Sequence, residues 1–462
     1  MRMTQTTAGE RLGASFRDPS GFLYTSGRRL LRQVNQLYAA DYRRLMESGL
    51  YARLTAAGLL ATHAEVDAPA AEPELAFKVI EPERVPFVSY PYEWSFSELK
   101  DAALATLSIQ SRCLSAGMSL KDASAYNIQF IHGKPVLIDT LSFEGYGEGS
   151  PWSAYRQFCQ HFLAPLALMA WRDVRLGQLL RIHIDGIPLD LASRLLPART
   201  RLVPGLLLHI HMHAGAQRRF AGRRLPARAR MSKTALLGLV GSLANSIRGF
   251  TWKPTGTPWA DYERTHSYSA AAALHKQALV KDWVERATPS TVWDLGANTG
   301  VYSRLPRRPG TAVMAFDLDP AAVEQNYLEV KRSKDQGLLP LLLDLTNPSA
   351  SLGWANRERD SLMARGPADL TLALALLHHL AIGNNVPLPQ IAEFLKAISR
   401  WLVIEFIPKE DPQAQRLLAV RKDIFSRYTR DQFEVDFGAQ FHIRASVQLQ
   451  DSSRCLYLMQ SR

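Results

Sequence analysis

The chain has 462 residues, of which 47% are hydrophobic and 21% charged, and its formal net charge is +12. Because domains usually hold roughly 100–200 residues, two or three are expected, each able to fold without a disulfide or structural metal. Cys113, Cys159 and Cys455 lie far apart and in no metal-ligand spacing, which is typical of a reducing compartment. A polar start and the lack of an apolar run of ~20 residues argue against a secretory signal and a membrane span. We therefore expect a cytoplasmic protein.

The positive charge is concentrated between Leu191 and Ala260, where the sequence contains no Asp or Glu. Twelve basic residues lie there, as many as the net charge of the whole chain: Arg194, Arg199, Arg201, Arg218, Arg219, Arg223, Arg224, Arg228, Arg230, Lys233, Arg248 and Lys253. Such a segment can attract phosphates, nucleic acid or an anionic membrane surface, or can be a solvated helical face packed on acidic neighbours. Because the segment shows no regular interleaved pattern of aromatic residues for stacking on bases, nucleic acid is a partner that the sequence allows but does not favour.

The first half of the chain predicts an α+β, helix-rich domain over 16–230, after a flexible tail at 1–15. Apolar periodicity and turn residues predict, in chain order, a β-hairpin around 25–27, a helix over 38–60, strands at 75–80 and 86–90, a long helix over 95–116, a second hairpin over 128–138, and a mostly helical stretch from 152 to 247.

The Pro/Gly/Thr-rich stretch around 253–258 predicts the domain boundary. We expect a basic helical connector over 231–260 and a second domain over 261–462. In that second domain the sequence predicts strands at 291–295, 312–317, 339–344, 370–374 and 401–406, with helices between them such as 320–332 and 387–399. Alternating strands and helices predict an α/β fold with a Rossmann-like, doubly wound and mostly parallel sheet.

Acidic residues and glycines follow the ends of the first three of these strands. The first strand ends in the run Asp294-Leu-Gly-Ala-Asn-Thr-Gly300, whose glycines allow a tight turn and a close approach of backbone to ligand. The second ends at Asp317, where a carboxylate can accept hydrogen bonds from both hydroxyls of a ribose. The third ends at Asp344, placed to accept the exocyclic amine of an adenine. In open α/β sheets, ligands bind beyond the carboxyl ends of the strands.

This series resembles the class I methyltransferases from about residue 261 onward. Their first motif is usually Asp/Glu-x-Gly-x-Gly-x-Gly; here Asn298 replaces the middle glycine, and Asn tolerates left-handed backbone angles well. The resemblance implies S-adenosylmethionine as the cofactor, with Asp317 at its ribose, Asp344 beside its adenine, and its methionine end lined by Asp294, Gly296, Asn298 and Gly300. A NAD site would need Gly-x-Gly-x-x-Gly, which this loop lacks.

Two histidines, His378 and His379, follow the fourth strand in a Leu-His-His-Leu run. Methyl transfer needs in-line positioning and, for an oxygen nucleophile, a base, so either histidine is a candidate catalytic residue. The alternative is that they pack on the cofactor or cap the next helix. Trp259, Tyr262 and Tyr268 precede the domain and are candidates for a lid or for ordinary packing. Without an Asp/Asn-Pro-Pro-aromatic motif, methylation of a nucleobase amine is disfavoured.

A second constellation lies in the first half, where Asp122, Asn127 and Asp139 follow one another at spacings of five and twelve residues. This pattern resembles protein kinases and small-molecule phosphotransferases over roughly 16–230, in which the first Asp orients the nucleophile and the other two residues hold Mg²⁺. The chain departs from that family because no Gly-x-Gly-x-x-Gly loop is present and Asp139-Thr-Leu stands in place of Asp-Phe-Gly. Polar loop residues that cap helices are the alternative interpretation.

The two-part architecture, including the run Ser89-Tyr-Pro-Tyr-Glu-Trp-Ser95, resembles bacterial nodulation-related, methyltransferase-like proteins. The leading hypothesis is a methyltransferase that modifies a small-molecule or carbohydrate-like acceptor, with oxygen as the acceptor atom and with the N-terminal domain positioning that acceptor. Two alternatives stay open: a bifunctional protein with a phosphotransferase-like N-terminal domain, and an RNA- or DNA-modifying methyltransferase that uses the basic segment 194–253. The sequence leaves the acceptor's identity and the oligomeric state open.

Overall fold

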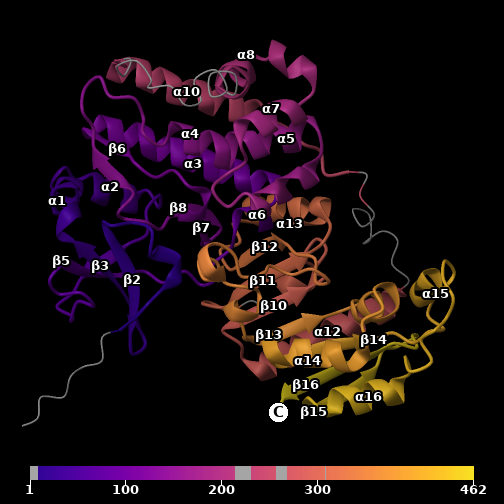
Figure 1. Cartoon of the computed structure of the whole chain (residues 1–462). Coiled ribbons are helices and arrows are strands. Elements are labelled where there is room, and N and C mark those ends of the chain that lie inside the picture. The colour runs from indigo at the N-terminus through magenta and orange to yellow at the C-terminus, as the bar shows by residue number, and fades with distance from the viewer. Residues whose placement is uncertain (1–8, 214–229, 256, 258–267, 307) are drawn as a thin grey trace, which may run out of the picture. The chain divides into compact units, whose positions relative to one another are not determined.

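The structure is a computed structural model that describes residues 9–213, 230–255, 257, 268–306 and 308–462 (Figure 1). It divides into two compact units, the first formed by Met1–Trp252 with Ser351–Arg359, and the second by Lys253–Ala350 with Asp360–Arg462. Within the described ranges, no helix is both long and apolar enough to cross a membrane.

The first unit begins with an antiparallel five-stranded sheet in the order β1-β2-β3-β5-β4. Its strands are β1 (Glu10–Arg11), β2 (Gly21–Ser26), β3 (Arg29–Asn35), β4 (His63–Glu65) and β5 (Ala76–Pro82). The helices beside it are α1 (Ala39–Glu47) and α2 (Leu50–Ala56). Apolar side chains from the sheet and α1 share one core cluster, which contains Val34, Tyr42 and Ile80. The hairpin predicted around 25–27 is confirmed as β2–β3.

Three local predictions in this region are wrong. The expected tail at 1–15 is ordered at its end, because β1 pairs with the exposed edge of β2; residues 1–8 lie outside the described part of the chain. The single helix expected over 38–60 is broken, since Gly49 adopts a left-handed φ of 67° between α1 and α2. The strand expected at 86–90 is an irregular loop.

The rest of the first unit is built around the long helix α3 (Phe96–Ser115). Ser95 caps it, because its side chain accepts the backbone N–H of Glu98 while the Glu98 carboxylate accepts that of Ser95. Two short antiparallel pairs follow: β6 (Met118–Leu120) with β9 (Phe143–Gly145), and the hairpin of β7 (Ile128–Ile131) with β8 (Lys134–Leu137). The remaining α-helices are α4 (Tyr155–Phe158), α5 (Ala164–Trp171), α6 (Leu179–Ile182), α7 (Leu189–Leu195), α8 (Pro204–Leu206) and α10 (Lys233–Gly249).

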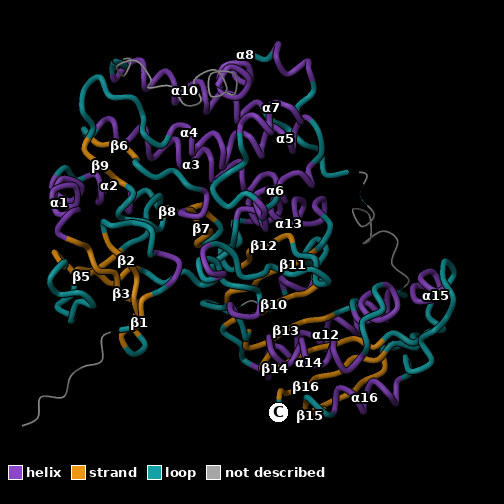
Figure 2. The backbone as a smooth tube through the Cα atoms, viewed as in Figure 1, coloured by secondary structure: helices purple, strands orange, loops and turns teal. Residues whose placement is uncertain are grey.

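The second unit is a seven-stranded sheet in the order β12-β11-β10-β13-β14-β16-β15 (Figure 2). Its strands are β10 (Thr291–Leu295), β11 (Ala312–Asp317), β12 (Leu338–Leu342), β13 (Ala368–Ala373), β14 (Ser399–Phe406), β15 (Phe441–Gln448) and β16 (Cys455–Ser461). The first five are parallel, and β15 and β16 form an antiparallel extension at one edge. The helices are α12 (Ala270–Ala287), α13 (Pro320–Ser333), α14 (Leu388–Ile398), α15 (Pro412–Leu418) and α16 (Arg430–Gly438).

The parallel strands of this sheet are buried along most of their length, as expected for a sheet covered on both faces. One core cluster joins α12 and α13 to the strands and includes Trp283, Val292 and Val330. The predicted α/β fold is thus present, with a mixed sheet, and β10 and β11 have the predicted bounds. The third strand ends at Leu342, so Asp344 lies in the loop beyond it.

The unit boundary differs from the predicted connector at 231–260. Helix α10 belongs to the first unit because Leu236, Val240 and Leu243 on one side of it are buried, and it packs on α3. The expected second domain at 261–462 is also interrupted, since Ser351–Arg359 belongs to the first unit. There the buried Glu358 carboxylate accepts two hydrogen bonds from the Arg17 guanidinium, at 2.7 and 3.1 Å.

Candidate functional site

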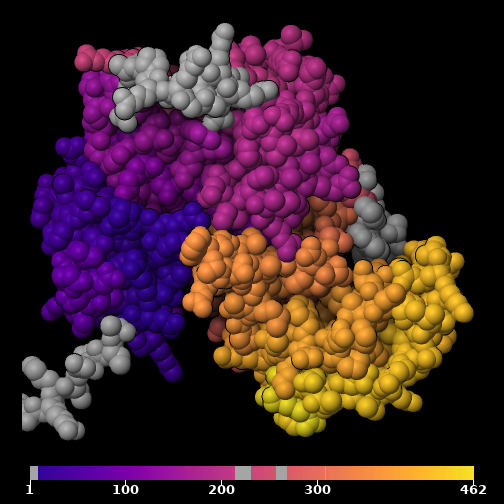
Figure 3. All heavy atoms as spheres, in the orientation of Figure 1, coloured from indigo at the N-terminus to yellow at the C-terminus, as the bar shows by residue number. Residues whose placement is uncertain are grey.

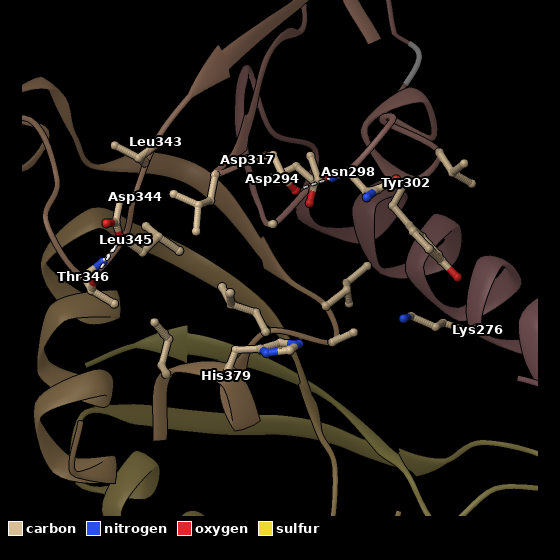
Figure 4. A pocket seen from close by; sticks show the side chains of 18 of the residues that line it. Lys276, Asp294, Asn298, Tyr302, Asp317, Leu343, Asp344, Leu345, Thr346 and His379 are labelled. Carbon is tan, nitrogen blue, oxygen red and sulfur yellow. Dashed lines mark hydrogen bonds between the residues drawn. The ribbon is translucent and has the colours of Figure 1, made fainter. Parts of the chain in front are cut away.

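A cavity of about 590 Å³ lies at the carboxyl ends of the parallel strands of the second unit (Figure 4). Residues that follow β10, β11, β12 and β13 line it, together with residues of α12. The strand order reverses between β10 and β13, and ligands in open α/β sheets bind at such a switch point. The cavity therefore lies where this fold leaves room for a ligand.

The loop after β10 forms one wall of the cavity and is held against β11. Gly296 and Asn298 line the cavity with left-handed φ values of 75° and 49°, so Asn298 adopts the conformation that its replacement of a glycine requires. The backbone N–H of Asn298 donates to Asp317 Oδ2 at 2.7 Å. Gly300 is not among the lining residues; a Cβ on it would come within 2.6 Å of the Asn326 side chain, so this glycine permits close packing on α13.

Asp317 ends β11 and faces the cavity. Its Oδ1 accepts the backbone N–H of Asp319 at 2.8 Å, and its Oδ2 accepts that of Asn298. Burial raises the pKa of Asp317 to about 6, against the lowering effect of these two hydrogen bonds. At neutral pH the group is thus an oriented carboxylate, and each of its oxygens retains a lone pair for a hydroxyl donor.

Two further predicted carboxylates line the same cavity. Asp294 is buried and accepts a 2.6 Å hydrogen bond from the Ser303 hydroxyl, and burial raises its pKa to about 6. Asp344 accepts the backbone N–H and the hydroxyl of Thr346 on its Oδ1, at 2.8 and 2.6 Å. In Figure 4, Asp344 lies on one side of the cavity, Asp317 and Asp294 lie near its middle, and Lys276 lies on the opposite side. The three carboxylates thus follow one another along the length of the cavity.

A buried ion pair that sequence reasoning missed closes that opposite side. Lys276, on α12, donates to Glu405 Oε2 at 2.8 Å and to the Tyr268 hydroxyl at 2.9 Å, and it lies 4.7 Å from the Tyr302 ring centroid. Glu405, at the end of β14, also accepts the backbone N–H of Ala375 at 2.8 Å. Burial lowers the pKa of Lys276, and the Glu405 carboxylate opposes that shift. The ion pair of Lys276 with Glu405 thus lies at this end of the cavity. The only sequence signal for this ion pair was Glu405, an ionisable residue in an otherwise apolar strand.

The two histidines occupy different places. His379 lines the cavity, and burial lowers its pKa to about 4, so its ring is neutral at physiological pH. His378 does not line the cavity; it is only 1% exposed, and its pKa is also lowered by burial and by the neighbouring His379, Arg454 and Lys276. A neutral imidazole facing the cavity can accept a proton or a hydrogen bond, and in this chain that description fits His379. Of the candidate lid residues, Tyr268 contacts Lys276 and Glu405, whereas Trp259 and Tyr262 lie outside the described residues.

The second constellation is also brought together, inside the first unit. Asn127 hydrogen-bonds Asp122, and the Ser142 hydroxyl links Asn127 to Asp139, at 3.3 and 2.7 Å. Burial, and then the nearby Asp139 carboxylate, raise the pKa of Asp122. Asp139 itself is paired at 2.6 Å with the buried guanidinium of Arg32, which comes from β3. A cation of the protein therefore already neutralises the carboxylate that a phosphotransferase would use for Mg²⁺.

The second unit is thus an α/β domain with a mixed sheet and with a cavity at its switch point that is lined by carboxylates. No protein-family model matches the chain. The chain is 34% identical to the nodulation protein NoeA of Rhizobium meliloti (strain 1021), over 97% of this chain and 95% of that protein. The protein therefore belongs to the family of the nodulation protein NoeA.

Solved structures match the chain over less than half of its length. The magnesium protoporphyrin IX methyltransferase ChlM of Synechocystis PCC 6803 with bound SAH is 16% identical, with a TM-score of 0.30, over 43% of this chain and 93% of that one. The N-methyltransferase NodS of Bradyrhizobium japonicum WM9 is 12% identical, with a TM-score of 0.31, over 42% of this chain and 98% of that one. WbdD, solved with the kinase inhibitor LY294002, is 16% identical, with a TM-score of 0.30, over 44% of this chain and 43% of that one.

Proposed function

We propose that the protein is an S-adenosylmethionine-dependent methyltransferase that modifies a small-molecule or carbohydrate-like acceptor at oxygen. The observation that carries the proposal is the order of charges along one cavity: Asp344, then Asp317 and Asp294, then the Lys276 ammonium. S-adenosylmethionine presents groups of complementary kinds in the same order, namely an adenine amine, two ribose hydroxyls, and a methionine end with an ammonium and a carboxylate.

The cavity fits a ligand of this size and polarity. Its volume of about 590 Å³ lies within the range of ~300–1,000 Å³ that is usual for small-ligand sites. Asp344 would accept the adenine amine, Asp317 would hold the ribose, and Asp294 would face the methionine ammonium. Lys276 would hold the methionine carboxylate, and the Lys276–Glu405 pair keeps its ammonium in place. When bound, the cofactor supplies an electrophilic methyl group on sulfur.

The residues of the chain then have two tasks, positioning and proton removal. Because methyl transfer from a sulfonium requires in-line geometry, the rigid loop around Asn298 contributes by fixing the methionine end. His379 faces the cavity with a neutral ring, and we assign it the role of accepting the proton of an acceptor hydroxyl. The first unit binds and positions the acceptor.

Phosphoryl transfer by the first unit is the weaker candidate. Asp122, Asn127 and Asp139 do meet in one polar cluster, but Arg32 is paired with Asp139 at 2.6 Å. Thermal unfolding with Mg²⁺ and ATP tests this point. We expect no ATP-dependent shift in the parent protein, whereas a shift that disappears in Asp139→Ala would restore the bifunctional alternative.

Calorimetric titration of the full chain with S-adenosylhomocysteine, the demethylated product, tests the proposed cofactor. We expect one site per chain with a Kd at or below the micromolar range, and competition by S-adenosylmethionine. If neither compound binds, the protein is not a methyltransferase of this kind. If both bind but labelled methyl is never transferred to saccharides, the cofactor assignment stands and the acceptor class is wrong.

A further inference from the structure

The helical part of the first unit exposes large apolar side chains beside arginines. Leu202 is 85% exposed, Met212 58% and Leu208 48%, and Leu207 is also exposed. They lie in the 3-10 helix Ala198–Leu202 and in the π-helix Leu207–Met212, near α7 and α8. The magenta atoms of this part of the chain form an outer surface in Figure 3. We call the exposed residues Arg199, Arg201, Leu202, Leu207, Leu208 and Met212 the apolar–basic face.

Hydrogen bonds from two histidines, the buried His209 and the partly buried His211, connect these elements. His211 bonds the Ser193 hydroxyl of α7 at 2.8 Å and the Thr200 hydroxyl of the 3-10 helix at 2.9 Å. His209 bonds Tyr155 and Ser242 on its buried side, at 2.8 and 3.0 Å. In a π-helix, i→i+5 bonding brings Met212 back above Leu207, so these two residues share the outward side. The leucines and Met212 are thus presented by a rigid scaffold.

The charge of this region has one sign. Arg199 and Arg201 are exposed, and no acidic residue occurs between Leu191 and Ala260. An apolar patch bordered by basic residues marks an interaction site, and its charge calls for an anionic partner. A second copy of the chain is a poor partner, because a two-fold contact of this face with itself would bring the arginines of both copies into one interface that has no acidic residue from this region.

We propose that the apolar–basic face docks on an anionic membrane surface. Leu202, Leu207, Leu208 and Met212 enter the interfacial layer, and Arg199 and Arg201 meet lipid phosphates. Peripheral membrane elements combine an apolar side with Arg and Lys in this way, and they lie in the plane of the interface without spanning the bilayer. A nucleic acid would satisfy the arginines but would leave the leucines against water or phosphate, and the exposed large apolar residues in 189–213 and 230–253 include no aromatic for base stacking.

Co-sedimentation of the full chain with extruded vesicles tests the proposal. We expect binding to phosphatidylcholine vesicles that contain about 30% phosphatidylglycerol, little binding to phosphatidylcholine alone, and weakening by salt. The triple variant Leu207→Ser, Leu208→Ser, Met212→Ser should lose at least about tenfold in affinity. The double variant Arg199→Gln, Arg201→Gln should lose roughly 25-fold in affinity, because each arginine contributes about a factor of five.

A matched control replaces exposed apolar residues of the second unit, with Leu274→Ser, Val420→Ser and Ile424→Ser, at positions 68%, 83% and 64% exposed. This variant should bind vesicles like the parent protein. If the apolar triple variant melts at a lower temperature than the parent protein, its loss of vesicle binding could reflect unfolding. The proposal is then tested by the vesicle binding of the arginine double variant and by the salt dependence of the parent protein. Absence of vesicle binding, equal binding by the arginine variant, or binding to duplex RNA but not to vesicles would overturn the proposal. So would a dimer that the triple variant dissociates.

Discussion

Replacing Asp317 by Asn should weaken the binding of S-adenosylhomocysteine without abolishing the fold. The substitution keeps the shape of the side chain but removes the negative charge and one of the two acceptor oxygens. A hydrogen bond to a charged group contributes about 1.5–3 kcal/mol, so the Kd should rise roughly 10–150-fold. Because Asp317 also holds the backbone N–H groups of Asn298 and Asp319, some loss of thermal stability is expected as well.

Calorimetry of Asp317→Asn beside a matched control separates these two effects. Asp369 also accepts two backbone N–H groups, from Ser290 and Thr291 at 3.0 and 3.1 Å, but it lies near the amino end of β13, at the edge of the sheet opposite the cavity. Asp369→Asn should therefore lower the melting temperature and leave the affinity unchanged. Equal affinities in Asp317→Asn and the parent protein would refute the assignment of Asp317 to the ribose.

The pH dependence of ligand binding, compared between the parent protein and Asp317→Asn, gives a second test. The pKa of Asp317 is about 6 in the free protein, and hydroxyl donors on the ligand favour its ionised form. The affinity for S-adenosylhomocysteine should therefore reach its maximum above pH 6. Below that value the affinity should fall by up to about tenfold per pH unit for each of Asp317 and Asp294, whose pKa values both lie at about 6, so the slope should be shallower in Asp317→Asn than in the parent protein. A parent protein whose affinity is constant from pH 7.5 to pH 5 would contradict the account.

Three further predictions concern stability. The pKa of Asp294 is raised in the folded chain from 3.8 to about 6, so its contribution to stability is present at low pH and is lost as pH rises through that window. Asp294→Asn should therefore raise the unfolding free energy by up to about 3 kcal/mol at pH 7.5. In denaturant titrations this gain should vanish near pH 4. Lys276→Met leaves the buried Glu405 carboxylate with only the more distant Arg454, at 3.8 Å, as its cation, and should cost up to about 3–5 kcal/mol, part of which a second change, Glu405→Gln, recovers. Gly300→Ala combines a φ of 84° with a contact of 2.6 Å to Asn326 and should lower stability by about 1–3 kcal/mol, whereas an unchanged melting curve would show that the loop repacks freely.

Local patterns made the second unit largely predictable. The strands β10 and β11 are short apolar runs bounded by polar and turn residues, and their bounds match the prediction. Asp317 and Asp344 could be placed because in an open parallel sheet the residues that follow strands meet at one edge. The replacement of a glycine by Asn298 was interpretable because few other residues adopt its backbone angles.

Long-range pairings could not be predicted. Lys276 and Glu405 are 129 residues apart, and only folding shows that the ammonium and the carboxylate share one end of the cavity. Arg17 and Glu358 are separated by 341 residues, so nothing local indicates that 351–359 belongs with the first unit. Likewise, the ion pair of Arg32 with Asp139 argues against Mg²⁺ binding by the kinase-like motif, and no spacing in the sequence predicts that pair.

The central claim is that the cavity at the edge of the second unit's sheet holds S-adenosylmethionine in one orientation. A crystal structure of the full chain with S-adenosylhomocysteine tests it most directly. The account predicts both ribose hydroxyls on the Asp317 carboxylate, the adenine amine at Asp344, and the carboxylate of the ligand on the Lys276 ammonium. Density for the ligand in another place, or with its adenine at Lys276, would contradict it.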